Sequence, residues 1–354
     1  MPTPNALAYL MLLVWPMVSL VLWRRLEAAQ ALIWTVLGGY LIMPMLTAIN
    51  LPVLPALGKT TIPNLAAYVG SRFVRGDRFR LMPQGMVGRF LVLLFLFSPV
   101  GTVLSNGDIA VQQGIVLQGI PATDMVSMVI GQATALIPFL LARHYLGTED
   151  GNRAVVAALV TAGLIYAPAI MVESMLSPQL HRWVYGFHQH DFFQTIRQGG
   201  YRPMVFLEHG LWVAFLTLMA VLSALIMVRT ASQVERPRAI AVFLFLVGML
   251  ILCKSAGVLV YAVVGCLLIL LTGWRTQVLV AAVLAVLVTA YPVMRGAHLV
   301  PVDDIVGYAR GFSEERSDSL KFRFDNEEQL LLHAQQRGTF GWGGYERNQL
   351  HNPY

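Results

Sequence analysis

Long apolar runs alternate with short polar connections over the first 293 residues of the chain. A bilayer core about 30 Å thick requires about 20 helical residues, so runs of this kind predict membrane-spanning helices. Several runs are shorter than that and need flanking residues or thinner lipid to cross. The ten predicted spans are 6–23, 31–48, 62–74, 90–104, 125–142, 154–172, 209–228, 239–253, 256–272 and 277–293, of which 62–74 is the weakest.

Composition supports the same interpretation. Charged residues make up 12% of the chain and hydrophobic residues 56%, whereas a soluble domain carries about 25% charged residues. We therefore expect an all-α, polytopic transmembrane helical bundle. The net charge of +6 does not indicate nucleic acid as a partner, because arginines in cytoplasmic loops account for it and no nucleic-acid-binding module is recognisable. Both cysteines, Cys253 and Cys266, lie in apolar spans, which excludes a disulfide framework in the polar tail.

The distribution of basic residues predicts the orientation of the bundle, because cytoplasmic loops are enriched in Lys and Arg. With the N-terminus outside, thirteen arginines fall on the inside and five basic residues on the outside. This count depends on the weak span 62–74. The inside residues are Arg24, Arg25, Arg72, Arg75, Arg78, Arg80, Arg89, Arg143, Arg153, Arg229, Arg236, Arg238 and Arg275; the outside ones are Lys59, Arg182, Arg197, Arg202 and Lys254.

The last part of the chain is polar, which predicts a transmembrane domain at 1–293 and an outer loop domain at 294–354. Phe322 and Phe324 suggest a short extended piece. Asp325 or Asn326 then caps a predicted helix that ends near Gln336 and is stopped by Gly338. GWGG at 341–344 predicts a tight turn. Since the sequence ends within a polar segment, we expect further C-terminal spans to follow.

Three candidate groups fall on the predicted outer face. Arg202 precedes the span at 209, where a guanidinium can bind a lipid-linked phosphate in a bidentate manner; the alternative is an arginine that only reaches head groups. Arg323, with Arg310 and Arg316 nearby, suits an anionic ligand.

The alternative for Arg310, Arg316 and Arg323 is that they lie on a solvated face and pair with Glu314, Glu315 and Asp318. His351, followed by Asn352, is a candidate general base, because histidine titrates near neutral pH; the alternative is an ordinary surface histidine.

Two further groups of residues are weaker candidates for a functional site. The motif HQHD at 188–191, with His181 nearby, offers nitrogen and oxygen ligands for a metal, but no cysteine or second ligand cluster accompanies it. A hydrated interfacial loop is the alternative interpretation that we favour. Lys254 lies between two spans and is expected at the outer interface, either as a structural residue or as a contact to an anionic substrate.

Two stretches resemble the O-antigen ligase/polymerase family of bacterial membrane glycosyltransferases. One runs from Tyr201-Arg202-Pro203 to His209. The other runs from Arg323 through a short helix and Gly341-Trp342-Gly343 to His351-Asn352. The order and spacing of these motifs carry the resemblance, and the rest of the chain matches only in hydropathy. The chain departs from the family at Ser255-Ala256-Gly257, where relatives often have Ser-Arg.

The resemblance implies a GT-C-like bundle in the bacterial inner membrane, with a partly helical periplasmic loop. The donor would be a glycan on undecaprenyl diphosphate, and the acceptor lipid A core or a lipid-linked repeat unit. Arg202 and Arg323 would hold the diphosphate, with Arg310, Arg316, Lys254 and Asn352 as further binding residues, and neutral His351 would deprotonate the acceptor hydroxyl. No metal or other cofactor is implied, because arginines can neutralise the leaving diphosphate.

The sequence does not choose between a ligase and a polymerase, which differ in acceptor. Two other classes stay open. A polysaccharide flippase or transporter would need buried charged residues within its spans, and the predicted spans carry almost none. A structural membrane subunit would use the polar tail to bind a partner. Membrane lipids are partners under every interpretation.

Overall fold

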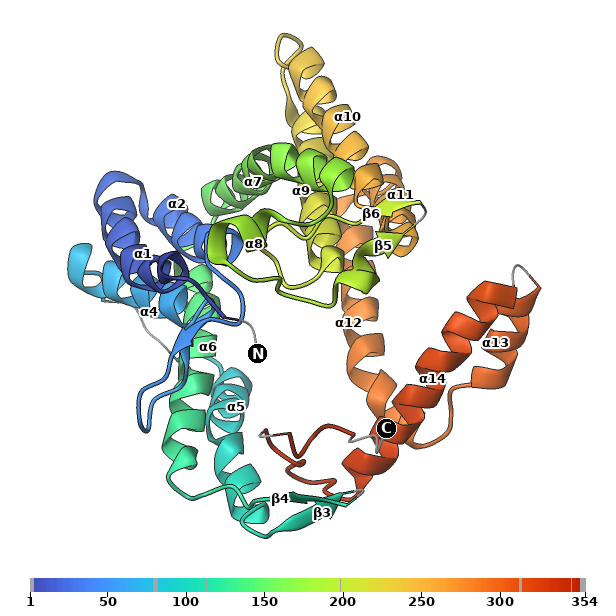
Figure 1. The fold of residues 1–354 in the computed structure, drawn as a ribbon. Helices are drawn as coiled ribbons and strands as arrows, with labels where there is room; N and C mark the ends of the chain where they lie inside the picture. Colours follow the sequence, from blue (N-terminus) through green and yellow to red (C-terminus); the bar gives the residue numbers. More distant parts are fainter. Residues whose placement is uncertain are drawn as a thin grey trace. The chain divides into compact units, whose positions relative to one another are not determined.

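The computed structural model of the chain describes residues 3–78, 82–112, 114–197, 199–311, 314–344 and 346–350. The fold is almost entirely helical (Figure 1), and strands within these ranges form only three short antiparallel pairs. All ten predicted apolar runs fall on helices, which confirms the all-α class. The predicted span 31–48 is helical only to Ile42, because Pro44 cannot continue the helix.

The helices are α1 Ala6–Arg25, α2 Ala28–Ile33, α3 Gly39–Ile42, α4 Thr61–Val69, α5 Met86–Ser105, α6 Asp124–Tyr145, α7 Glu149–Leu176, α8 Leu180–Tyr185, α9 Gly210–Thr230, α10 Arg236–Leu252, α11 Ala256–Leu271, α12 Trp274–Gly296, α13 Val302–Arg310 and α14 Glu314–Gln335, with the π-helical turns η1 Trp34–Gly38 and η2 Gly70–Val74 and the 3₁₀ turn η3 Phe192–Thr195. The strand pairs are β1 Ala48–Ile49 with β2 Leu57–Gly58, β3 Ala110–Gln112 with β4 Ile115–Leu117, and β5 Ile196–Arg197 with β6 Gly200–Tyr201.

Among the described residues, six helices are long and apolar enough to cross a membrane, namely α1, α5, α6, α7, α9 and α12. In α12 the most apolar stretch has a mean hydropathy of 2.1, and none of it is buried by protein. Apolar side chains exposed in this way require lipid around them. The chain is therefore a membrane protein, whereas the full number of ten spans stays a prediction, since α10 and α11 have only 17 and 16 residues.

The chain forms two compact units, which are described separately. The first comprises residues 1–89 and 130–272, and the second comprises residues 90–129 and 273–354. The predicted boundary at residue 293 is a different division, because it separates a membrane-embedded part from a part outside the membrane. It stays a prediction.

Helix α9 forms the centre of the first unit, with α7, α10 and α11 packed around it (Figure 1). More than half of its most apolar stretch is buried. Small residues allow the helices to approach closely: a Cβ added to Gly163 of α7 would come within 2.6 Å of the Cβ of Ala220. Membrane helices commonly associate through such small residues, since apolar area alone does not drive association in lipid.

The segment between α7 and α9 is held to the end of α7 by a buried carboxylate. Glu173 accepts hydrogen bonds from the backbone N–H groups of Leu180, Met204 and Val205 at 2.7–2.9 Å. Gln189 donates to the carbonyls of Val205 and Leu207. These bonds fix the backbone immediately before α9, so Glu173 has a structural role.

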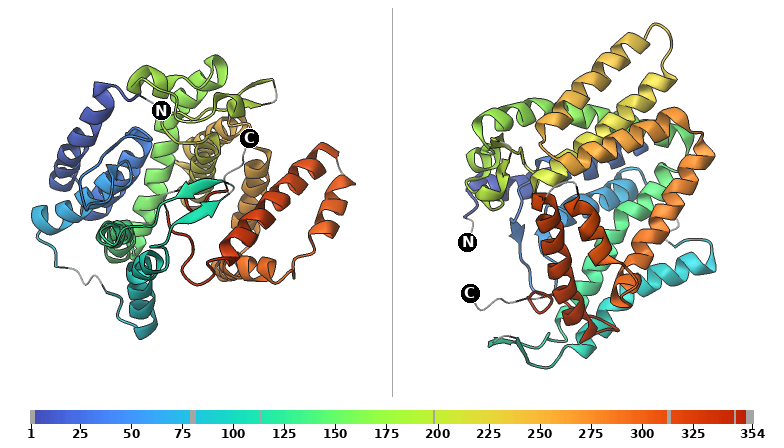
Figure 2. Two further views of the ribbon diagram at one scale, coloured as in Figure 1. Left: turned by 60° about the horizontal axis from the view of Figure 1, so that its bottom comes forward. Right: turned by 90° about the vertical axis from the view of Figure 1, so that its right-hand side faces the viewer.

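In the second unit, α13 and α14 lie side by side (Figures 1 and 2). The predicted extended piece at Phe322 and Phe324 is wrong, as is the predicted helix start at Asp325 or Asn326, because α14 already begins at Glu314. Within α14, Glu327 and Glu328 both pair with Arg295 of α12, which fixes the middle of this helix to α12. The predicted end near Gln336 is confirmed, and Gly341 and Gly343 have the positive φ angles of a turn.

Candidate cationic site at the start of α9 and α11

Arg202 lies in the loop between β6 and α9, and its side chain crosses the beginning of α9. A Cβ on Gly210 would lie only 2.3 Å from Cδ of Arg202, so the glycine is needed to admit the arginine. A terminal nitrogen of Arg202 donates to the carbonyl of Lys254 at 3.3 Å. The Nε–H is buried, and no described residue accepts a hydrogen bond from it.

Lys254 connects α10 to α11 and turns back toward the same loop. Its φ of +47° places it in the left-handed region, which the tight connection requires. Its Nζ donates to the carbonyl of Arg197 at 3.4 Å, and a Cβ on Gly200 would come within 2.1 Å of this nitrogen. The structure therefore brings together Arg202 and Lys254, two of the sequence-predicted binding residues. Figure 1 shows that β5 and β6 lie next to α11.

The side chains of Arg197, Arg202 and Lys254 at this site are all positively charged. Burial lowers the pKa of Arg202 below its usual value, and the neighbouring charge of Arg197 lowers it further. Within the described part of the chain, neither arginine nor Lys254 takes part in an ion pair with a carboxylate. An anion would relieve this excess of positive charge. We call Arg197, Arg202 and Lys254 the cationic site.

Two histidines lie next to the cationic site. His209 is the N-cap of α9, and its Nδ1 accepts a hydrogen bond from the backbone N–H of Leu211 at 3.0 Å. The ring of His190 contacts that of His209, with the centroids 4.9 Å apart. Burial lowers the pKa of His209, and the charges of His190, Arg202 and Arg197 lower it further.

The motif HQHD does not gather metal ligands. In the ranges that the structure describes, no group of three or more His, Cys, Asp or Glu side chains could hold a metal ion. His181 uses both ring nitrogens internally, since Nδ1 contacts the carbonyl of Phe187 and Nε2 accepts from the N–H of Met45. Asp191 caps η3 by accepting from Phe193. The interfacial-loop interpretation fits these contacts.

The remaining predicted site residues belong to the second unit or lie outside the described residues. Arg323 is exposed on α14, and Arg310 is exposed at the end of α13. The structure describes the backbone of Arg316 but not its side chain, and His351 and Asn352 lie outside the described residues. Among the described side chains, neither Arg310 nor Arg323 pairs with Glu314 or Asp318, and the side chain of Glu315, like that of Arg316, is not described. The described ion pairs of this unit involve Arg295, Arg337 and Arg347.

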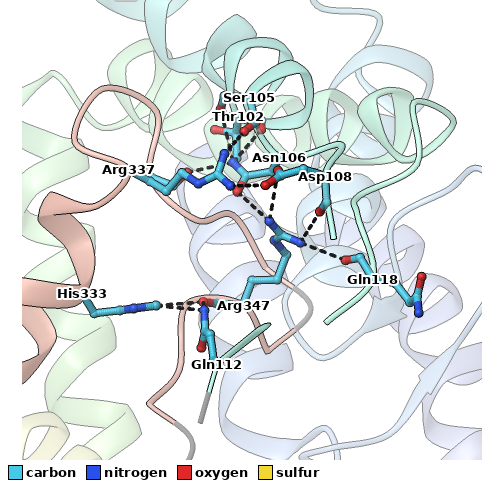
Figure 3. Close-up of polar contacts among 10 residues, drawn as sticks. Thr102, Ser105, Asn106, Asp108, Gln112, Gln118, His333, Arg337 and Arg347 are labelled. Atoms are coloured by element: carbon cyan, nitrogen blue, oxygen red, sulfur yellow. Dashed lines mark hydrogen bonds and ion pairs between the residues drawn. The ribbon is translucent and has the colours of Figure 1, made fainter. Parts of the chain in front are cut away.

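Sequence reasoning missed a polar cluster in the second unit (Figure 3). Arg347 is fully buried and donates to the carbonyls of Asp108 and Gln118, at 2.9 and 3.0 Å. Its own carbonyl lies 2.9 Å from Nε2 of His333 and accepts from Gln112 at 3.1 Å. The cluster joins the segment after α14 to the β3–β4 hairpin, and we call it the tail clasp.

Trp342 and Arg337 complete the tail clasp. The ring of Trp342 stacks on that of His333, with the centroids 4.6 Å apart, and its Nε1 donates to the carbonyl of His333. Arg337 pairs with Asp108 and donates to the carbonyl of Ser105. The only sequence signals for this cluster were the tryptophan within GWGG and the polar run Asn106-Gly-Asp108 between two apolar spans.

Among the described residues, we treat the cationic site and the tail clasp as the candidate functional sites. No protein-family model, curated protein or solved structure matches this chain.

Proposed function

We propose that the chain is a membrane glycosyltransferase of surface polysaccharide assembly, which transfers a glycan from undecaprenyl diphosphate to a sugar acceptor. The observation that carries the proposal is the cationic site, in which Arg202 and Lys254 meet without a carboxylate partner at the start of two apolar helices. A lipid-linked diphosphate has the complementary charge, and its chain requires the lipid that surrounds such helices.

Helix geometry adds to the attraction for an anion. The N-termini of α9 and α11 begin at Gly210 and Ala256, directly after His209 and next to Lys254. Each helix carries partial positive charge at its first turn, because its first backbone N–H groups lack intrahelical acceptors. A guanidinium with a free Nε–H beside these helix ends suits the non-bridging oxygens of a diphosphate.

An apolar cavity in the same unit fits the lipid part of such a donor. It has a volume of about 390 Å³ and is lined by α2, η1, α3, α6, α7 and α9. Tyr40 lines the cavity and stacks on Trp212, in the first turn of α9, with ring centroids 5.9 Å apart. A chain of isoprene units could occupy this cavity while its head group lies near the start of α9.

The roles of the residues follow from their chemistry. Arg202 holds the diphosphate and stabilises its departure, with Lys254 as a further cation, and the roles that the resemblance implies for Arg323, Arg310 and Arg316 stay predictions. His351, in its neutral form, takes the proton of the acceptor hydroxyl, and Asn352 contacts the substrate beside it. The proposal includes a GT-C-like bundle in the bacterial inner membrane with a periplasmic loop domain. The acceptor is lipid A core or a lipid-linked repeat unit.

Deletion of the gene in its host, followed by gel analysis of the polysaccharide, tests this function. Decoration with single repeat units identifies a polymerase, and full-length chains retained on the lipid carrier identify a ligase. An unchanged polysaccharide pattern would contradict both. Loss of carrier-linked repeat units from the periplasmic face, with the cytoplasmic pool intact, would support a flippase instead.

A further inference from the structure

The hydrogen bonds of His190 and His209 determine which nitrogen of each ring carries the proton. In His209, Nδ1 accepts from the N–H of Leu211 at 3.0 Å, and in His190, Nδ1 accepts from the N–H of Asp191 at 2.7 Å. A ring nitrogen that accepts a hydrogen bond carries no proton, so the proton of each neutral ring lies on Nε2. Both side chains therefore present an Nε2–H donor.

Both side chains are half-buried, the two rings lie against each other, and among the described residues their hydrogen bonds use only Nδ1, so each Nε2–H is open to a ligand. The charged or titratable groups that act on His209 are His190, Arg202 and Arg197, all of them donors or cations. The buried Nε–H of Arg202 also lacks an acceptor. Donors of three side chains thus lie close together without a hydrogen bond to any described residue.

We infer that His190 and His209 bind phosphoryl oxygens of an anionic lipid through their Nε2–H groups, next to Arg202. On the proposed function, on which this assignment rests, the lipid is the diphosphate donor. The same tautomer excludes other roles. A ring whose Nδ1 caps a helix and whose Nε2 is protonated has no free lone pair for a metal ion or for accepting a substrate proton. The histidine pair is a binding element and not a base.

Two substitutions separate binding from helix capping. His209→Asn keeps an oxygen where Nδ1 caps α9, because asparagine is a preferred N-cap residue, but it removes the distal donor. His209→Gln places an amide N–H near the position of Nε2 and caps poorly. His298→Asn, at an exposed histidine of the second unit with a φ of +56°, is the matched control.

The binding experiment uses farnesyl diphosphate with the full chain in nanodiscs of neutral lipid. We expect His209→Asn and His190→Asn each to weaken binding about tenfold to 150-fold, which corresponds to one hydrogen bond to a charged group. His209→Asn should keep the wild-type melting temperature, whereas His209→Gln should lower it and bind more tightly than His209→Asn. Unchanged affinity in both asparagine variants would overturn the inference.

A second titration identifies the source of the phosphoryl group. If phosphatidylglycerol in the nanodisc competes with farnesyl diphosphate and its effect is lost in His209→Asn, the site binds a lipid head group and the donor assignment is overturned. Histidine ¹⁵N spectra near pH 7 should show two rings protonated at Nε2 that shift when the diphosphate is added. Protonation at Nδ1, or stoichiometric Zn²⁺ binding lost in His190→Asn, would also overturn the inference.

These binding measurements do not depend on glycan transfer. A protein that binds the diphosphate through the histidines but transfers no glycan would contradict the proposed function and leave the histidine assignment intact. A protein that transfers glycan but binds the diphosphate equally well without the histidine donors would contradict the histidine assignment alone.

Discussion

Arg347 and Asp108 are 239 positions apart in the sequence and are joined twice: the guanidinium donates to the backbone carbonyl of Asp108 at 2.9 Å, and it pairs with the carboxylate at 3.6 Å. Arg347 is completely buried, whereas the side chain of Asp108 is about half exposed. The arginine therefore fixes the segment after α14 to the β3–β4 hairpin.

Arg347→Met should detach this segment. The substitution leaves the carbonyls of Asp108 and Gln118 without their donor, and an unpaired buried polar group costs about 1–3 kcal/mol. We expect faster proteolytic cleavage between residues 337 and 350 and a lower melting temperature. Arg323→Met, at an exposed arginine of α14, is the control and should change stability by less than about 0.5 kcal/mol. Equal protection in both variants would contradict the role of Arg347.

Acidification should loosen the same contact. The hydrogen bond from Arg337, followed by the charges of Arg337 and Arg347, keeps the pKa of Asp108 below its usual value. A lowered carboxyl pKa stabilises the fold at pH values above the unfolded pKa of about 3.9, and this stabilisation is lost as pH falls through the folded value. Proteolytic protection of the tail should decrease with acid in the wild type, and Asp108→Asn should remove that dependence. An identical acid response in the two proteins would count against the pairing.

Lys59 should make stability increase with pH in the alkaline range. It is buried, it donates to the carbonyls of Met43 and Phe206 at 2.6 Å, and burial lowers its pKa to about 7, although Glu208 opposes this shift. Between about pH 7 and pH 10 the unfolded chain binds more protons at this residue than the folded chain, so raising the pH favours the folded state. The melting temperature of the wild type should therefore rise relative to that of Lys59→Met between about pH 7 and 9.5. A constant difference would show that Lys59 does not titrate in this range.

Gly210→Ala should displace Arg202 without removing any charge. The new Cβ would come within 2.3 Å of Cδ of Arg202, so the side chain must leave the start of α9. We expect glycan transfer to fall by at least about tenfold, the size of effect that misplacement of a binding group produces. Gly257→Ala is the matched control, because a Cβ there meets nothing within 4 Å. Equal activities in the two alanine variants would show that the position of Arg202 is unimportant.

His351→Ala should abolish glycan transfer while the protein still inserts into the membrane and binds the lipid-linked donor. A general base contributes about 100-fold to 10,000-fold to a reaction rate, whereas donor binding depends on the cations of the cationic site. Transfer is measured with purified protein and labelled donor, and binding with donor alone. Retained transfer would remove the base assignment.

The apolar helices could be predicted from the sequence because a long hydrophobic run carries its own signal, independent of its neighbours. The start of α14 at Glu314 was not predicted. The short alternation at Phe322 and Phe324 and the capping residues Asp325 and Asn326 are weak local signals, because a few residues do not distinguish a strand or a cap from the middle of a long helix.

Only part of the candidate site could likewise be predicted from the sequence. The sequence indicated that Arg202 and Lys254 share one side of the membrane, since both lie next to apolar spans. It did not indicate their contact across 52 positions or the need for Gly210. The tautomers of His190 and His209 depend on backbone N–H groups whose directions only the folded chain defines. The bonds of Arg347 to Asp108 and Gln118 likewise join segments that have no common sequence pattern.

Glycan transfer by the purified protein in lipid, measured for the wild type, Arg202→Lys and Arg182→Lys, tests the central claim most directly. Lysine keeps the charge of Arg202 but lacks its Nε–H and its planar fork, whereas Arg182 is exposed on α8 and serves as the control. The account predicts transfer by the wild type and Arg182→Lys, and a loss of at least about tenfold in Arg202→Lys. Full activity of Arg202→Lys, or no transfer by the wild type, would contradict it.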